Sequence, residues 1–175
     1  MLRLLVLRVT ADLLLALCVV SPLVFVAMLW LTRAGGKRAM AALAGCATAA
    51  VFSLGWDALA ARMGWWTYPY SGELLTSLTV SMTMAFLFGG VAGLAGWRMM
   101  RAMGRTGAVT FLAGFVGLGL IRDQMLELNT TAFAIGEGPM PHVMGGIGYL
   151  TIAVAVQVTM FVLAGPPTRD SLRTD

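Results

Sequence analysis

The sequence predicts an all-α integral membrane protein with five transmembrane helices, and two observations support this fold class. First, 59% of the 175 residues are hydrophobic and only 11% are charged, whereas soluble domains carry about 25% charged residues. Second, apolar runs of about 20 residues recur along the chain, which is the length a helix needs to cross the hydrocarbon of a bilayer. Because a bilayer offers backbone groups no other partner, such runs predict α-helices.

The five apolar runs follow one another along residues 1–165, which we expect to form a single transmembrane domain. The first run contains Pro22, where a kink is expected. It is longer than the roughly 7–15 residues of a signal-peptide core, so a retained first helix is predicted. Residues 166–175 form a short polar tail. The expected helices are 10–31, 39–61, 74–96, 108–126 and 143–163.

The distribution of basic residues predicts the topology. Lysine and arginine accumulate in cytoplasmic loops, and here they concentrate in the first and third loops and in the tail. The N-terminus is therefore expected outside and the C-terminus inside, in a multi-pass protein of a bacterial inner membrane. Trp30 and Trp97 are expected at the inner ends of their helices. The basic residues assigned to the inner side are Arg33, Lys37, Arg38, Arg98, Arg101, Arg105, Arg169 and Arg173.

After the first, orphan helix the chain is predicted to form two tandem hairpins of the same orientation, which would be parallel repeats. Asp57 lies near the end of the first helix of one hairpin, and Asp123 lies in the corresponding place of the other. Superposing the hairpins also aligns Leu54 with Leu120. Parallel repeats commonly frame a site at their interface, so an internal repeat with a site between its halves is expected.

Four acidic residues near the predicted outer boundary are the catalytic candidates. In one interpretation the two aspartates converge between the hairpins as an acid–base pair with separated pKa values, supported by two glutamates from the loops. In the other, they are hydrated at the boundary or paired with Arg62 or Arg122. Glu127, one turn after the second aspartate, fits a local ion-pair cluster. The four catalytic candidates are Asp57, Asp123, Glu73 and Glu137.

Aromatic residues beside these acids are candidates for ligand binding, because the faces of aromatic rings attract cations. The single histidine, at the entry of the last predicted helix, is included as a capping or interfacial residue. One histidine with loop carboxylates is a weak metal signature, so neither a metal nor a cofactor is expected. Cys18 and Cys46 are interpreted as small buried apolar residues. The binding candidates are Trp56, Trp65, Trp66, Tyr68 and His142.

One stretch, about residues 51–72, resembles the lycopene cyclase domain family of carotenoid-making bacteria and fungi. The similarity lies in Trp-Asp-Ala-Leu-Ala at 56–60, Gly-Trp-Trp at 64–66 and a proline at 69. It implies a small helical membrane protein that acts on a carotenoid-type polyene. The family typically continues with Pro-x-Glu-Glu, whereas residues 70–74 are Tyr-Ser-Gly-Glu-Leu, so part of the family's acidic equipment is absent.

Three classes of function fit these features. The first is an enzyme that performs acid–base chemistry on a lipid-soluble isoprenoid or carotenoid-type ligand. The second is a non-catalytic accessory or assembly subunit of a larger membrane protein complex, and the third is a small-solute transporter whose acids line a path. The expected partners are membrane lipids, a hydrophobic small molecule or other membrane subunits. Nucleic acid is not expected, because the topology accounts for the basic residues.

Overall fold

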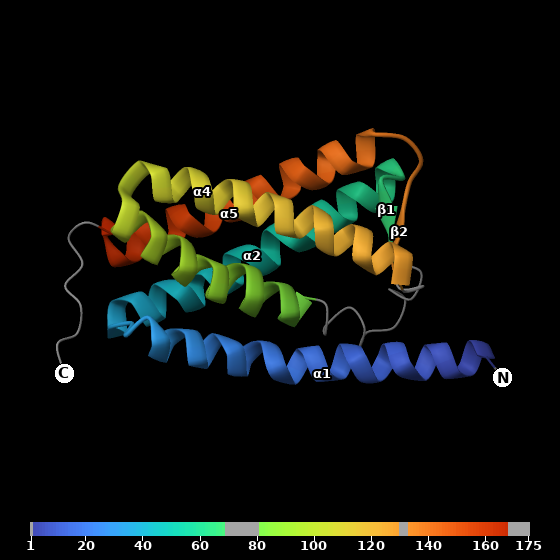
Figure 1. Ribbon diagram of the computed structural model, residues 1–175, viewed down its shortest axis with the longest axis horizontal. Helices are drawn as coiled ribbons and strands as arrows, with labels where there is room; N and C mark the ends of the chain where they lie inside the picture. The colour runs from blue at the N-terminus through green and yellow to red at the C-terminus, as the bar shows by residue number, and fades with distance from the viewer. Residues whose placement is uncertain (1, 69–80, 130–132, 168–175) are drawn as a thin grey trace.

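The computed structural model describes residues 2–68, 81–129 and 133–167. Within these ranges the chain is mostly helical, and its helices lie side by side along the long axis of the molecule (Figure 1). Two very short strands and one π-helix complete the described structure. The elements are α1 (Leu2–Leu31), α2 (Gly36–Met63), β1 (Trp66–Thr67), the π-helix η1 (Ala85–Val91), α4 (Ala92–Asn129), β2 (Ala134–Ile135) and α5 (Met140–Ala164).

Three helical stretches of the described chain are long and apolar enough to cross a membrane. They are Gly36–Met63, Ser81–Leu128 and Met140–Ala164, and the described part of α1 adds the shorter apolar helix Ala16–Leu31. Large apolar side chains cover the outside of these helices, and Leu128, for example, is 77% exposed. Such a surface is stable against lipid but not against water, so the chain is a membrane-embedded helical protein.

The helices expected at 10–31, 39–61 and 143–163 are present, and each is longer than the sequence indicated. Long polar residues such as Lys37 and Arg62 are good helix formers, so α2 continues past its apolar run into polar turns. Pro22 does not end α1, which remains one helix on both sides of it. Residues 74–80 of the expected third helix lie outside the described residues.

The prediction of a loop at 97–107 is wrong, because nearly all of this segment is helical. Within α4 one residue, Gly104, has non-helical angles of φ 58° and ψ −131°, a conformation that is accessible mainly to glycine. The chain reverses direction there, so that 105–129 runs back beside 92–103 (Figure 1). A Cβ on Gly107 would collide with the carbonyl oxygen of Met99. The connection is therefore a tight reversal centred on one glycine.

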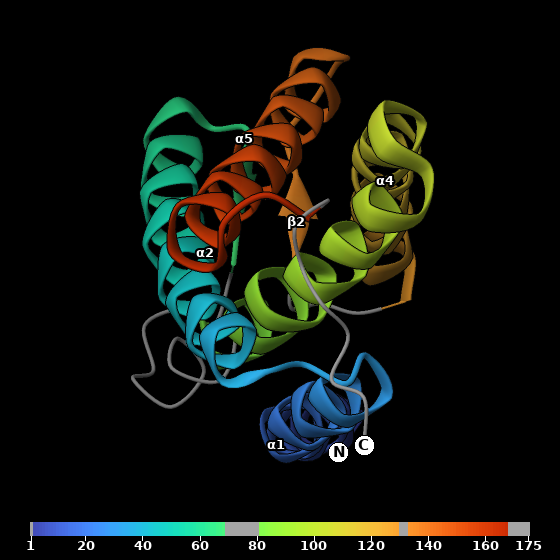
Figure 2. The same ribbon diagram turned by 90° about the vertical axis from the view of Figure 1, so that its left-hand side faces the viewer.

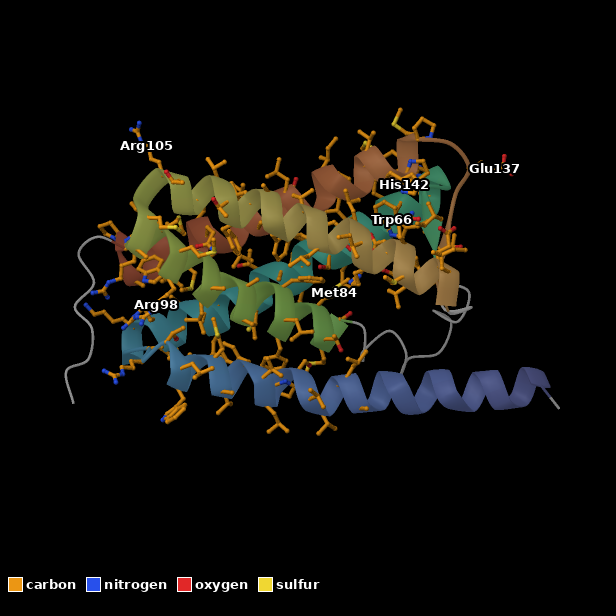
Figure 3. The ribbon with its side chains drawn as sticks, in the orientation of Figure 1. Trp66, Met84, Arg98, Arg105, Glu137 and His142 are labelled. Carbon is orange, nitrogen blue, oxygen red and sulfur yellow. The ribbon has the colours of Figure 1, made fainter. Side chains whose placement is uncertain are left out.

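The two tryptophans expected at the inner ends of their helices differ in burial. Its side chain is 1% exposed and belongs to the core beside Leu94 and Met160, whereas Trp30 is 79% exposed. Because the helix continues past Gly96, Trp97 falls one turn after Gly93 and Leu94, on the same inward face. Trp97 is thus a core residue, next in the chain to Arg98 at one end of the bundle (Figure 3).

Glycines bring α2 and η1 into very close contact. A Cβ on Gly89 would lie 2.5 Å from Cα of Cys46 and would collide with the carbonyl oxygen of Gly45. A Cβ on Gly90 would lie 2.5 Å from the ring of Phe25 in α1. Small residues allow helices to approach closely in a bilayer. The η1 segment therefore packs between α2 and α1, and α1 lies at the edge of the bundle (Figure 2).

A two-stranded antiparallel pairing joins the ends of α2 and α4. Trp66 in β1 pairs with Ile135 in β2, and the N–H of Gly136 donates to the carbonyl of Trp65 at 2.8 Å. Glu127 of α4 accepts a hydrogen bond from the N–H of Ile135 at 3.2 Å. This end of the bundle is opposite the end that carries Arg98 and Arg105 (Figure 3).

Candidate functional site

A cavity of about 40 Å³ lies between α2, α4 and α5, close to the β1–β2 pair. A water molecule needs about 10–15 Å³ on this measure, so the cavity has room for roughly three waters or a small chemical group. Asp57 of α2 and Asp123 of α4 both line it. The convergence of these two acids, which the sequence left open, is therefore present in the structure.

The two aspartates lie at the same depth in their helices. Asp57 is six residues before Met63, the last residue of α2. Asp123 is likewise six residues before Asn129, the last residue of α4. At 1.5 Å per residue, each carboxyl group lies about 9 Å from the end of its helix. The cavity therefore lies near this end of the bundle, between the helices and the connections that contribute Trp66, Tyr68 and Phe133.

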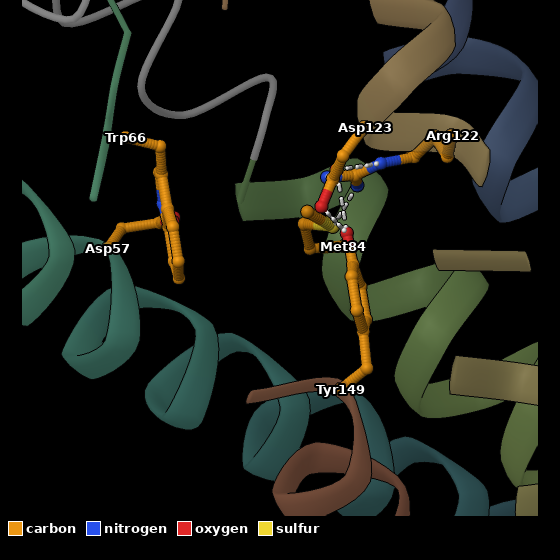
Figure 4. A network of polar contacts seen from close by, with 6 residues as sticks. All are labelled: Asp57, Trp66, Met84, Arg122, Asp123 and Tyr149. Carbon is orange, nitrogen blue, oxygen red and sulfur yellow. Dashed lines mark hydrogen bonds and ion pairs between the residues drawn. The ribbon is translucent and has the colours of Figure 1, made fainter. Parts of the chain in front are cut away.

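Asp123 belongs to a dense polar network (Figure 4). Nε and Nη2 of Arg122 donate to Oδ1 of Asp123 at 3.0 and 2.6 Å. The hydroxyl of Tyr149 in α5 lies 2.8 and 2.9 Å from the two carboxylate oxygens and donates to them. Charge-assisted bonds of this kind are short and strong. The network holds the carboxyl group of Asp123 in place beside the countercharge of Arg122.

Residues in and next to η1 also contact the guanidinium of Arg122. Its Nη1 donates to the sulfur of Met84 at 3.1 Å. Its central carbon lies 5.4 Å from the ring centroid of Phe88 and 5.6 Å from that of Tyr149, which is within the range of cation–π attraction. Met84 directly precedes the π-helix and Phe88 lies within it. Since π-helical turns frequently occur at functional sites, this irregular segment belongs to the architecture of the cavity.

Asp57 has different partners. Its Oδ1 accepts a hydrogen bond from the indole Nε1 of Trp66 at 3.0 Å, and β1 holds Trp66 in place. The hydroxyl of Tyr68 interacts with both Asp57 and Arg122. Burial raises the pKa of Tyr68 above its usual range, so this hydroxyl remains protonated. Arg62, the alternative partner, is exposed at the end of α2.

The other expected site residues divide into two groups. Trp56, Trp66 and Tyr68 line the cavity, while Trp65 packs against Trp66 with ring centroids 6.3 Å apart. Glu137 is exposed in the turn before α5. These four aromatic residues are therefore in or next to the site, whereas Glu137 is not among the residues that line the cavity.

A further candidate, His142, is not among the residues that line the cavity. His142 is exposed in the first turn of α5, and its Nδ1 lies 3.4 Å from the side-chain nitrogen of Gln124. Figure 3 shows His142 and Glu137 at the same end of the molecule as Trp66. Glu73 lies outside the described residues. Within the described ranges no three His, Cys, Asp or Glu side chains gather closely enough to hold a metal ion.

Tyr149 and Met84 are site residues that the sequence analysis missed. Tyr149 is a polar residue in the middle of an apolar helix, which is itself a signal of function in a membrane span. A Cβ on Gly119 of α4 would lie 2.6 Å from its ring, so this glycine leaves the space that Tyr149 occupies. Met84 carried no comparable signal, because methionine is a common core filler.

The fold and the cavity define a membrane-embedded helical protein with two aspartates, an arginine and aromatic side chains around one small interior space. In comparisons with protein-family models, curated proteins and solved structures, the chain matches none.

Proposed function

We propose that this chain is a multi-pass protein of a bacterial inner membrane that binds a lipid-soluble isoprenoid or carotenoid-type ligand and performs acid–base chemistry on it. The observation that carries the proposal is the convergence of Asp57 and Asp123 on one cavity with different partners. Pairs of titratable groups in contrasting environments are typical of acid–base sites. Aromatic side chains around the cavity suit an apolar or cationic guest.

The proposed topology has five spans, with the N-terminus outside and the C-terminus inside. Residues 81–103 and 105–129 count as separate spans because the chain reverses at Gly104. Arg98 and Arg105 lie at one end of the bundle and Glu137 at the other (Figure 3), which agrees with basic residues on the cytoplasmic side. The equal depth of the two aspartates, and the pairing of the strands that follow their helices, support the tandem-repeat interpretation.

In this proposal Asp57 is the proton donor and Asp123 is a fixed anion. Asp57 bonds with Trp66, a neutral donor that tolerates either protonation state of the carboxyl group. Asp123 is held by Arg122 and by the hydroxyl of Tyr149, so protonating it would break a charge-assisted pair. The mobile proton is therefore assigned to Asp57.

The proposed step is the protonation of a carbon–carbon double bond. The proton of Asp57 and the π-electron pair of the alkene form a new C–H bond, which leaves a carbocation on the neighbouring carbon. The ring faces of Trp56 and Tyr149 stabilise that cation, and Asp123 adds a compensating negative charge. Loss of a proton from an adjacent carbon to Asp57 restores the acid. The sequence is redox-neutral and needs no cofactor.

The volume of the cavity limits what enters it. About 40 Å³ accommodates a few heavy atoms, which is far less than a complete carotenoid. Only the reacting end of the ligand therefore occupies the cavity, and the remaining chain lies along the apolar surface of the helices.

Asp57→Asn tests the proposed acid. Because general acids contribute about 10²- to 10⁴-fold to rates, we expect conversion of an acyclic polyene to fall at least 100-fold, measured by chromatography of pigments from a carotenoid-producing host. Glu137→Gln is the matched control, since Glu137 is exposed and does not line the cavity. Normal conversion by Asp57→Asn would rule out the proposed chemistry.

Extraction of the native protein in nanodiscs, followed by mass spectrometry, tests the class of function. We expect an isoprenoid or pigment to co-purify with the chain. Recovery in a stoichiometric assembly with other membrane subunits and without such a ligand would instead support the accessory-subunit alternative.

A further inference from the structure

The hydroxyl of Ser53 in the cavity wall has no hydrogen bond, as is also true of the buried hydroxyls of Ser21 and Thr83 elsewhere in the described chain. Ser53 of α2 is 5% exposed and lines the cavity, and its Oγ has no hydrogen-bond partner among the described residues. Hydroxyls inside membrane helices commonly donate to the carbonyl four residues earlier. Thr48 does so to Ala44 at 3.0 Å and Thr159 to Ala155 at 3.0 Å. Ser53 therefore carries a hydroxyl in the wall of the cavity that has no hydrogen bond within the described chain.

The position of Ser53 relates it to the proposed acid. It lies four residues before Asp57 on α2, and residues at this spacing are neighbours on one helix face, with Cβ atoms about 5–6 Å apart. Both side chains line the same cavity. Ser53 is also one turn further from the end of α2 than Asp57. A group bound by Ser53 would thus occupy the inner part of the cavity, with the adjoining atoms beside the carboxyl group.

The volume of the cavity, about 40 Å³, requires the group bound at Ser53 to be small. Ile152 and Gly148 of α5 contribute apolar surface without a hydrogen-bonding side chain. A Cβ on Gly148 would lie 3.4 Å from the indole of Trp56, in contact with it. Buried hydroxyls are nearly always hydrogen-bonded, so a ligand oxygen would supply the bond that this hydroxyl lacks among the described residues.

We propose that the Ser53 hydroxyl binds an oxygen atom of the ligand, and that the cavity accepts the oxygen-bearing end of an apolar isoprenoid chain. The ligand class is an isoprenoid with a terminal hydroxyl or carbonyl group and not a pure hydrocarbon. This inference rests on the proposed function and narrows its substrate. The roughly three water-sized positions of the cavity fit one oxygen and the carbons next to it. Ser53 is thereby a binding residue that orients the ligand toward Asp57.

The test compares two probes that differ in one oxygen atom. Purified full-length protein in nanodiscs is titrated with geranylgeraniol and with the hydrocarbon in which a methyl group replaces its hydroxymethyl group. Quenching of tryptophan fluorescence reports binding, because Trp56 and Trp66 line the cavity. One hydrogen bond corresponds to about a threefold to tenfold difference in affinity. We expect the alcohol to bind more tightly than the hydrocarbon by that factor. In Ser53→Ala we expect the two probes to bind with equal affinity.

Thr151→Ala is the matched control, since the Thr151 hydroxyl donates to the carbonyl of Ile147 at 2.8 Å within α5. It should leave the preference for the alcohol unchanged. Equal affinities of both probes for the unmodified protein, unaltered by Ser53→Ala, would overturn the inference and indicate that Ser53 bonds to water, while the proposed function would stand. Failure of both probes to bind the unmodified protein would overturn the proposed function together with this inference.

Discussion

Replacing Gly89 with alanine is expected to lower the free energy of unfolding by about 3 kcal/mol, the upper end of the range for overpacking a well-packed interior. The added methyl would lie 2.5 Å from Cα of Cys46 and would collide with the carbonyl oxygen of Gly45. Both are backbone atoms, so no side-chain rotation relieves the contact, and α2 must move away from η1. Unfolding by sodium dodecyl sulfate, followed by circular dichroism, measures the loss.

Gly114→Ala is the control for this substitution. Gly114 is also a helical glycine of the same chain, but a Cβ there meets nothing within 4 Å. Alanine is favoured over glycine in helices by about 0.5–1 kcal/mol, so this variant should be as stable as the parent or slightly more stable. If both variants unfold at the same detergent concentration, the close α2–η1 approach is not a determinant of stability.

Arg122→Gln is the second substitution with a large expected effect. It removes the countercharge of Asp123, which is 13% exposed and would be left as an uncompensated interior charge. Breaking a buried pair in this way costs about 3–5 kcal/mol. The side chain of Arg122 keeps 29% of its surface exposed, so we expect a loss of about 3 kcal/mol in the same unfolding assay.

A double-mutant cycle separates the lost pair from other effects of the arginine. Adding Asp123→Asn to Arg122→Gln removes both charges, and we expect the double variant to be more stable than Arg122→Gln alone. Coupling energies for side chains in direct contact are about 0.5–3 kcal/mol. Strictly additive losses would show that Arg122 stabilises the protein through Met84 and Phe88 and not through Asp123.

The sequence was sufficient for predictions that depend on local composition. Hydropathy predicted the apolar helices, because every backbone amide in lipid must be satisfied within its own helix. The matching depth of Asp57 and Asp123 was also visible, since it is a count of residues from the end of each helix. The sequence also indicated Trp56, Trp66 and Tyr68, because these aromatic residues lie close to Asp57 along the chain.

Other features depend on which helix faces meet, and the sequence does not encode them locally. The apolar runs did not show that Trp97 is buried in the core while Trp30 is exposed. The reversal at Gly104 depends on a single backbone conformation. Glu137 and His142 were chosen for their chemistry, but they lie outside the lining of the cavity.

By itself, the sequence determined that this is a helical membrane protein with two equally deep aspartates, because length, hydropathy and residue spacing are properties of each segment alone. Only the tertiary structure decided that Asp57 and Asp123 share one cavity and that Arg122 and Tyr149 hold the second of them. It also decided that Ser53 has no hydrogen-bond partner among the described residues. The physical reason is that helix crossings set by glycine contacts, such as Gly89 against Cys46, determine which side chains face each other. Those crossings join segments that are far apart in the chain.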